Sequence, residues 1–427
     1  MTTSPETAPA PAGIPDLPDP RSARCPFDPS PQMRGLAAFG PVFRVRNWDG
    51  KTPWVVTSHA EQKALLSDNR LSVDFAAPGF PSPIARHGGG EGESEVHGEA
   101  AQDGDNHGVT DLSFVGMDDP EHARLRRMVS GVFTIKRVEA MRPAVQELVD
   151  GFIDRLLDGP KPVDLVQAFS LPIPSLVISE LLGVPYGDHE FFQINSKTLV
   201  SLTATPAERH SAHTALVDYL DQLVGERLGN PGEDVLSRLA AQVRAGELTR
   251  REVAVMGVLL LLGGHETTAN MITLGILLLL QHPRQAARVR DAEDPEVVVG
   301  AVEELLRFLT IAHLGRRRTA LEDIEIAGQT IRKGEGVIML GELANRDPSV
   351  FPDPDRLDIT RDARQHQAFG AGTHHCIGQP LARMELQVIY PALLRRIPTL
   401  RLATELDQVP FKFDAVIYGA HELHVTW

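Results

Sequence analysis

Cysteine is scarce in this chain of 427 residues, which contains only Cys25 and Cys376, in dissimilar settings. Two such cysteines cannot form a disulfide framework, so we expect folding in a reducing cytosol and a cytoplasmic location. Positive charge is also in deficit, with 42 Lys and Arg against 57 Asp and Glu and a formal net charge of -15. This balance argues against a nucleic-acid partner.

Long apolar runs are lacking as well. The most apolar stretch, residues 253–262, ends at a Gly-Gly-His-Glu segment and is too short to span a bilayer. Residues 1–20 are rich in Pro, Ala and Thr, without a basic start or an apolar run, and predict a disordered leader rather than a signal peptide or membrane anchor. No Ser/Gly-rich linker divides residues 21–427, which predict one domain.

The secondary-structure signals favour a mainly α protein with small β-sheets at one side. Short strands are expected at 42–45 and 53–57, and again at 324–326 and 337–339, while helical patterns dominate 121–309.

Residues 76–111 differ in composition, being rich in Gly, Glu and Asp. His87, His97 and His107 each precede a glycine there, and their regular spacing raises the question of a metal site. A polar, Gly-rich tract without flanking ordered structure favours instead a mobile surface insertion.

A Gly-rich loop near the end of the chain reads FGAGTHHCIG over residues 369–378. Gly370 lets the backbone turn tightly, and Gly378 removes bulk beside the sulfur. Cys376 lies just ahead of a predicted helix, whose N-terminal field is expected to lower the pKa of the thiol. The loop therefore predicts a thiolate metal ligand, with a buried structural cysteine as the alternative.

A long helix is predicted in the middle of the chain. Thr249 and Glu252 form a capping box, and helical residues continue without proline to Gln281. Gly263 and Gly264 interrupt its centre at a cost of about 1 kcal/mol each relative to Ala, so we expect a neighbour that needs the space they leave.

Both segments resemble those of cytochromes P450. The cysteine loop is similar to the family's heme-binding signature, and residues 263–268 are similar to its small-Gly-x-acid-Thr segment. The resemblance extends from about Val42 to the C-terminus. It implies the triangular-prism cytochrome P450 fold, with heme b between the long central helix and the Cys helix, and Cys376 as axial ligand of the heme iron.

The resemblance also implies roles for the acid-alcohol pair of the central helix. Thr267 would hydrogen-bond bound oxygen, and Glu266 would help to pass protons from solvent. The alternative is a helix kink in which the hydroxyl bonds back to a carbonyl. His265, beside the acid, is expected to face solvent or a neighbouring helix.

Heme propionates need cationic partners, and the resemblance implies four of them. His122 and Arg126 lie four residues apart on one helix face, Arg318 is favoured among three consecutive arginines, and His374 belongs to the cysteine loop.

A structural triad is implied on the thiolate side of the heme. Glu304 and Arg307 share a helix face, and the family's third arginine matches Arg356.

An apolar substrate pocket is expected above the heme, with the 76–111 insertion forming part of its lid. The residues expected to line it are Leu259, Leu262, Gly263, Leu314 and Ile417.

The implied function is that of a monooxygenase. It would use O₂ to hydroxylate or epoxidise an apolar organic substrate, in secondary metabolism or xenobiotic oxidation, with electrons from NAD(P)H delivered by a separate ferredoxin reductase and ferredoxin. Two alternatives are a heme-thiolate nitric oxide reductase and a peroxide-driven enzyme, but both types commonly lack the acid-alcohol pair. A heme sensor or carrier would have no need of that pair either.

Overall fold

The computed structural model describes residues 13–21, 26–83 and 113–427. Cys25 and the three His-Gly dipeptides lie outside these residues. The disordered leader predicted for residues 1–20 extends too far, because residues 13–20 are partly held in place. Asp16 forms a parallel β-bridge with Arg46, and the Leu17 amide donates to the Arg46 carbonyl at 2.8 Å.

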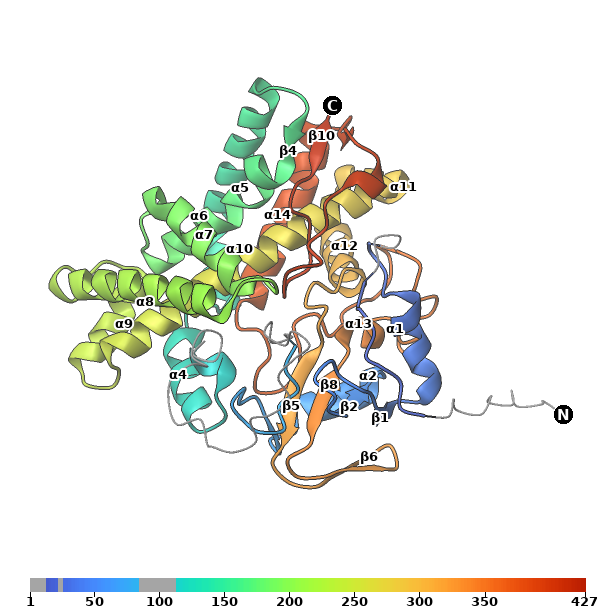
Figure 1. Cartoon of the computed structure of the whole chain (residues 1–427). Helices are drawn as coiled ribbons and strands as arrows, with labels where there is room; N and C mark the ends of the chain where they lie inside the picture. The colour runs from blue at the N-terminus through green and yellow to red at the C-terminus, as the bar shows by residue number, and fades with distance from the viewer. Residues whose placement is uncertain (1–12, 22–25, 84–112) are drawn as a thin grey trace.

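Helices make up most of the described chain, as predicted (Figure 1). They are α1 Pro31–Gly35, α2 His59–Leu66, α4 Glu121–Ser130, α5 Ile135–Asp158, α6 Pro172–Leu182, α7 His189–Val200, α8 Pro206–Gly229, α9 Val235–Arg244, α10 Arg250–Gln281, α11 Pro283–Arg290, α12 Pro295–Phe308, α13 Gly341–Ala344 and α14 Gln379–Arg396.

Helix α10 crosses the molecule, and α6, α8 and α14 pack against it (Figure 1). Its start is fixed by the predicted capping box, in which the Thr249 hydroxyl accepts from the Glu252 amide and the Glu252 carboxylate accepts from the Thr249 amide. Its 32 residues carry few charges, and most are buried. Because these helices cover most of its surface, α10 lies at the centre of the hydrophobic core.

The small sheets lie in two places: the five-stranded sheet is at one end of the molecule, whereas the three-stranded sheet is beside α5 near the C-terminus, so the prediction of sheets at one side is right only in part (Figure 1). The strands are β1 Val42–Arg44, β2 Trp54–Val56, β3 Leu71–Ser72, β4 Val163–Asp164, β5 Arg316–Ala320, β6 Ile324–Ile326, β7 Gln329–Ile331, β8 Gly336–Met339, β9 Arg401–Leu402 and β10 His424–Thr426. The largest sheet has the order β1-β2-β8-β5-β3, with β2 and β8 parallel and the other pairs antiparallel. All four predicted strands are present, whereas β5, which contains the three arginines, was not predicted.

The last part of the chain returns to the interior. Its loop 410–421 is closed by two backbone hydrogen bonds of 2.8 Å, from the Lys412 amide to the Gly419 carbonyl and from the His421 amide to the Pro410 carbonyl. A third, from the Tyr418 amide to the Ile311 carbonyl, attaches this loop to the segment after α12. Within the described residues, no helix combines the length and apolarity that crossing a bilayer requires.

Candidate functional site

The cysteine loop is closed by its own backbone. The Cys376 amide donates to the Phe369 carbonyl at 3.0 Å, and Gly370 and Gly372 have φ values of +75° and +69°, in the left-handed region that favours glycine. A Cβ on Gly372 would lie 2.1 Å from the Leu66 carbonyl oxygen. The tight turn is as predicted, and at Gly372 the backbone of Leu66 also excludes a side chain.

The Cys376 sulfur has the surroundings of a ligand that is accessible from one side. Cys376 retains exposed surface, yet burial is the largest influence on its thiol and raises its pKa. Backbone amides of Gly378 and Gln379, and the charges of Arg126 and Arg316, act in the opposite direction. The prediction of a lowered pKa is therefore wrong for the protein alone, because desolvation outweighs the helix N-terminus. When a metal cation binds the sulfur, those same amides and charges would help to stabilise the thiolate form.

Two arginines near the sulfur also fix the loop. Arg316 on β5 donates to the Gln367 and Ala368 carbonyls at 2.9 and 2.8 Å, and Arg126 on α4 donates to the His375 carbonyl. Arg316 was not predicted, since nothing in a run of three arginines distinguishes the one that turns toward the loop.

The predicted propionate ligands gather in one place. The rings of His122 and His374 lie 4.1 Å apart, and burial, together with the charges of His122 and Arg318, lowers the pKa of His374 to about 4. Burial and the nearby Arg316 lower the pKa of Arg318 to about 10. Basic groups are thus crowded together in a poorly solvated region.

This basic cluster fits a dianionic group. His122 Nδ1 lies 2.9 Å from Asp119 Oδ1, but its buried Nε2 has no partner. Among the described residues, Arg318 has no carboxylate within ion-pair distance and donates only to the Arg317 carbonyl, at 2.7 Å. An unpaired nitrogen and an unpaired guanidinium beside the cysteine loop are the partners that heme propionates require. The residues present therefore fit heme.

One face of α10 stays accessible at its centre. Leu259, Leu262, Gly263 and Thr267 are partly or fully accessible, and their spacing places them together on the helix surface. A Cβ on Gly263 would meet no atom within 4 Å, whereas one on Gly264 would lie 2.6 Å from Ile178 Cγ1 on α6. Gly263 thus leaves open space as predicted, but Gly264 serves the packing of α6.

The acid-alcohol pair is held by unequal contacts. The Thr267 hydroxyl donates to the Gly263 carbonyl at 2.7 Å, while Glu266 is buried with its Oε2 at 3.2 Å from Asn270 Nδ2 and 3.4 Å from Lys412 Nζ. Burial raises the pKa of Glu266, but the charge of Lys412 and the neighbouring polar groups reverse this and leave it lowered. Neither Asn270 nor Lys412 was predicted.

His265 does not face solvent. It is buried on α10, with Nδ1 at 2.7 Å from the Leu261 carbonyl, and burial lowers its pKa. It therefore lies in the protein as a neutral side chain at neutral pH.

The structural cluster forms with a different third member. Glu304 and Arg307 are joined by two bonds of 2.7 and 2.8 Å and are completely buried. The third arginine is Arg361, whose Nε lies 3.3 Å from Glu304. The assignment of Arg356 is wrong: its mostly exposed side chain instead pairs with Asp358 at 2.8 Å.

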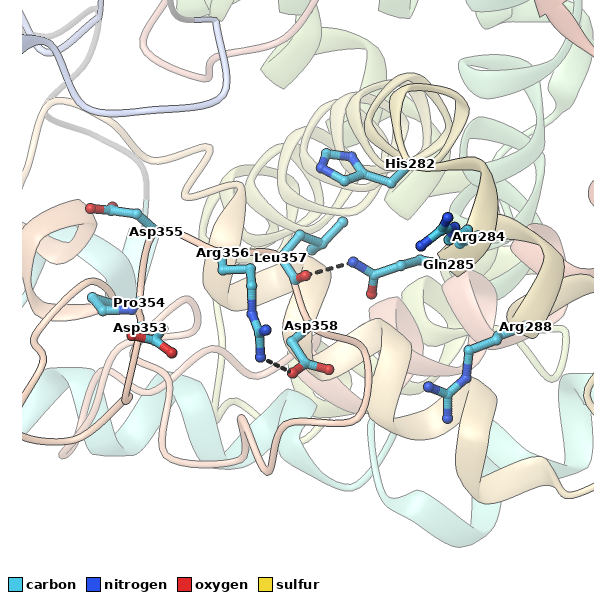
Figure 2. Close-up of a pocket in the computed structure, with 10 residues that line it drawn as sticks. All are labelled: His282, Arg284, Gln285, Arg288, Asp353, Pro354, Asp355, Arg356, Leu357 and Asp358. Atoms are coloured by element: carbon cyan, nitrogen blue, oxygen red, sulfur yellow. Dashed lines mark hydrogen bonds and ion pairs between the residues drawn. The ribbon is translucent and has the colours of Figure 1, made fainter.

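Figure 2 shows Arg356 directed at Asp358 in a surface groove between α11 and residues 353–358. This groove has a volume of about 1060 Å³ and contains no residue of the cysteine loop. It is separate from the candidate site.

The predicted pocket residues come from three segments. Leu259 and Leu262 lie on α10, Leu314 precedes β5, and Ile417 belongs to loop 410–421; all are partly accessible. The Tyr418–Ile311 backbone bond brings that loop next to the segment that carries Leu314. The proposed lid falls largely on residues outside the described ranges. No cluster of three His, Cys, Asp or Glu side chains suited to a metal occurs within those ranges.

These features define a candidate heme-thiolate site, and comparisons with known proteins agree. A family model described as Cytochrome P450 matches residues 208–410. Cytochrome P450 GfsF of Streptomyces halstedii is 52% identical over 97% of this chain and 96% of its own length. Vitamin D3 dihydroxylase of Streptomyces griseolus is 45% identical over 100% of this chain and 99% of its own length.

Solved structures extend the agreement to the fold. The crystal structure of GfsF matches with a TM-score of 0.85 at 51% identity, covering 97% of this chain and 100% of that one. The crystal structure of the mycinamicin VIII C21 methyl hydroxylase MycCI of Micromonospora griseorubida matches with a TM-score of 0.82 at 39% identity, covering 94% of this chain and 97% of that one. The chain belongs to the cytochrome P450 family, in its actinomycete type, and is an oxidoreductase of the monooxygenase class; the family implies heme iron.

Proposed function

We propose that this enzyme hydroxylates or epoxidises an apolar secondary metabolite, with electrons from NAD(P)H delivered by a separate ferredoxin reductase and ferredoxin. Its relatives include proteins named for hydroxylation, among them the vitamin D3 dihydroxylase of Streptomyces griseolus, 45% identical over 100% of this chain. The observation that carries the proposal is the acid-alcohol pair, Glu266 and Thr267, on the α10 face that remains open at Gly263.

The chain's basic residues would hold the heme. Cys376 would bind the iron through its sulfur, assisted by the Gly378 and Gln379 amides that stabilise negative charge there. Arg318 and the free Nε2 of His122 would bind the propionates. When bound, heme supplies the activation of O₂ by two electrons.

Glu266 and Thr267 would supply protons to the open face of α10. The Thr267 hydroxyl has its proton directed at the Gly263 carbonyl, from which it can rotate toward the open space. Glu266, ionised beside Lys412, is able to take up a proton from solvent and return to the carboxylate after giving it away. The leucines of the same face would exclude water and orient an apolar substrate.

Nitric oxide reduction with direct use of a dinucleotide is the second candidate, and a sensor is the third. Neither function needs a buried acid beside a hydroxyl on the central helix. Glu266 and Thr267 therefore carry the distinction between these functions and a monooxygenase.

The first test is a screen of apolar metabolites, including macrolides and terpenoids, for a ferric spin-state change, followed by turnover with ¹⁸O₂. We expect a product containing one labelled oxygen atom when a ferredoxin system is present. Reduction of nitric oxide by NAD(P)H without a protein partner, and no labelled product from any binding compound, would overturn the proposal.

Two variants test the assigned residues. Cys376→Ser should abolish the spectral signature of a thiolate-ligated ferrous carbonyl complex. Thr267→Ala should retain that signature but divert reducing equivalents into peroxide. Unchanged coupling in Thr267→Ala would count against its role in proton supply.

A further inference from the structure

Lys412 reaches the buried acid of α10 from a distant part of the chain. It lies 146 residues beyond Glu266 in sequence, and their side-chain atoms Nζ and Oε2 are 3.4 Å apart. Both side chains are largely withdrawn from solvent, with 16% of Lys412 and 9% of Glu266 exposed. In the described part of the chain, Glu266 is the one carboxylate within ion-pair distance of Lys412.

The backbone of loop 410–421 fixes where this lysine lies. The Lys412 amide donates to the Gly419 carbonyl at 2.8 Å, and the neighbouring residues Phe411 and Ala420 form an antiparallel bridge. The final, red part of the chain in Figure 1 therefore approaches α10 as a closed loop rather than as a free end.

The opposite side of that loop supports the same carboxylate indirectly. A Cβ on Gly419 would lie 1.8 Å from Asn270 Oδ1, so the glycine backbone packs directly on the Asn270 amide group. Asn270 Nδ2 in turn donates to Glu266 Oε2 at 3.2 Å and to the Glu266 carbonyl at 2.8 Å. Loop 410–421 thus holds Glu266 through Lys412 and through Asn270.

Charge balance makes Lys412 the decisive partner. Burial alone would favour the neutral acid, and the charge of Lys412 is the largest influence in the opposite direction. The charge of His265 acts in the same direction but ranks below Lys412, and burial lowers the pKa of His265 itself. The 3.4 Å separation of Lys412 from Glu266 is longer than the usual 2.7–2.9 Å of a charge-assisted hydrogen bond, so the contact fixes the charge of Glu266 without locking its position.

We propose that Lys412 is a positioning residue that keeps Glu266 ionised between proton transfers, and that loop 410–421 thereby sets the pH range of proton delivery. The proposal rests on the proton-supply role given to Glu266 above. Glu266 takes up a proton from solvent and, on giving that proton to the open face of α10, returns to the carboxylate form that the charge of Lys412 favours. Lys412 itself neither gains nor loses a proton in this cycle.

The test is the titration of Glu266 in the ferric holoenzyme without turnover. The carboxyl infrared band that disappears in Glu266→Gln reports its protonation. In Lys412→Met this titration should move to higher pH by about one unit or more, because desolvation remains and the compensating charge is gone. Lys412→Arg should restore the wild-type titration.

Lys51→Met is a matched control. Lys51 also faces a carboxylate, with Nζ at 4.0 Å from Asp49, but it is exposed in the turn between β1 and β2. This variant should leave the Glu266 band unchanged. A Glu266 titration that is the same in Lys412→Met and wild type would overturn the proposal.

Two further measurements keep the outcomes separable. If Lys412→Met folds poorly, the free energies of unfolding of Lys412→Met, Glu266→Gln and the double variant give the coupling energy between the two side chains. If the two single losses simply add in the double variant, the groups are not coupled and the proposal is overturned. With a substrate in hand, the pH profile of product formed per NAD(P)H should shift in the same direction as the band. Absence of any product would refute the proposed function and leave the titration result intact.

Discussion

Two buried glutamates, one on α12 and one on α10, are held in opposite ways. Glu304 on α12 makes two bonds to Arg307, accepts the Asp358 amide at 2.9 Å and lies 3.3 Å from Arg361. Both of its oxygens accept hydrogen bonds, three of them on Oε1, and both it and Arg307 are fully buried. Such a group is fixed in place by donors from three residues.

Glu266 on α10 is the contrasting case. Its side-chain contacts to Asn270 and Lys412, at 3.2 and 3.4 Å, are both longer than the bonds that Glu304 accepts from Arg307 and the Asp358 amide, and both fall on the same oxygen, Oε2. The difference separates a carboxylate that anchors the fold from one that can change partners. Removal of the first should therefore affect stability, and changes around the second should affect coupling and pH dependence.

The largest effect is expected for Glu304→Ala. The substitution leaves the Arg307 guanidinium buried without its carboxylate, which typically costs about 3–5 kcal/mol. Urea unfolding of the ferric protein measures this loss, and heme retention in the purified variant shows whether the thiolate side still folds. A loss below about 1 kcal/mol would mean that the cluster does not anchor the fold.

A third buried glutamate, Glu342 on α13, should make stability depend on pH. Both of its carboxyl oxygens lack hydrogen-bond partners, and Arg21 Nε is 3.9 Å away. Burial raises its pKa from 4.5 to about 7, although Arg21 and Arg346 oppose the rise. The folded protein thus binds a proton that the unfolded chain has lost, so this contribution is complete below pH 4.5 and fades as pH rises through 7.

Glu342→Gln is expected to remove that dependence. The raised pKa corresponds to about 3 kcal/mol between acidic and alkaline conditions. Urea unfolding of the wild type and of Glu342→Gln at about pH 5 and about pH 8 measures this. Between the two pH values the wild type should lose about 3 kcal/mol of stability relative to the variant, so that the variant is favoured at high pH. An equal difference in unfolding free energy between the two proteins at both pH values would show that Arg21 keeps the carboxylate ionised.

The sequence predicted those contacts that depend on local spacing. Glu304 and Arg307 are three residues apart on one helix, so any α-helix brings them together. The same is true of the capping box at Thr249 and of the glycine-dependent turn at Gly370. The family resemblance added the roles of these residues but not their partners.

Contacts between distant segments were not predictable in this way. Lys412 meets Glu266 only because loop 410–421 closes on α10, and no periodicity links the two positions. Arg361 and Arg356 lie five residues apart in an irregular segment, where the backbone path decides which guanidinium points inward. The net pKa of Cys376 likewise depends on packing density, which a motif does not contain.

The two central glycines of α10 should respond differently to a methyl group. Gly264→Ala places Cβ 2.6 Å from Ile178 Cγ1, and overpacking of this kind costs about 1–3 kcal/mol, against about 1 kcal/mol gained in helix propensity. Gly263→Ala meets open space and should keep that gain. Thermal unfolding of the heme-free proteins compares the two.

The effects of the two substitutions on substrate binding should follow the opposite order from their effects on stability. Gly263 lies on the accessible face of α10, so its methyl group is expected to alter the spin-state change produced by substrates, whereas Gly264→Ala should leave that change closer to wild type. If Gly263→Ala alters neither stability nor the spin state, the open face of α10 is not the substrate side.

The smallest effect is expected for Arg356→Ala, and it separates the two candidates for the third arginine. Arg356 pairs with Asp358 at the surface, where 67% of its side chain is exposed and such a pair contributes about 0–1 kcal/mol. Arg361→Ala instead removes a guanidinium that bonds the buried Glu304 and the carbonyls of Asp353 and Arg356, and should cost at least about 2 kcal/mol in urea unfolding. Equal losses in the two variants would mean that Arg356 stabilises the Glu304 cluster as much as Arg361 does.

Because the segment 353–358 also forms one wall of the groove in Figure 2, a small loss of stability in Arg356→Ala would show that this wall keeps its shape without the ion pair to Asp358.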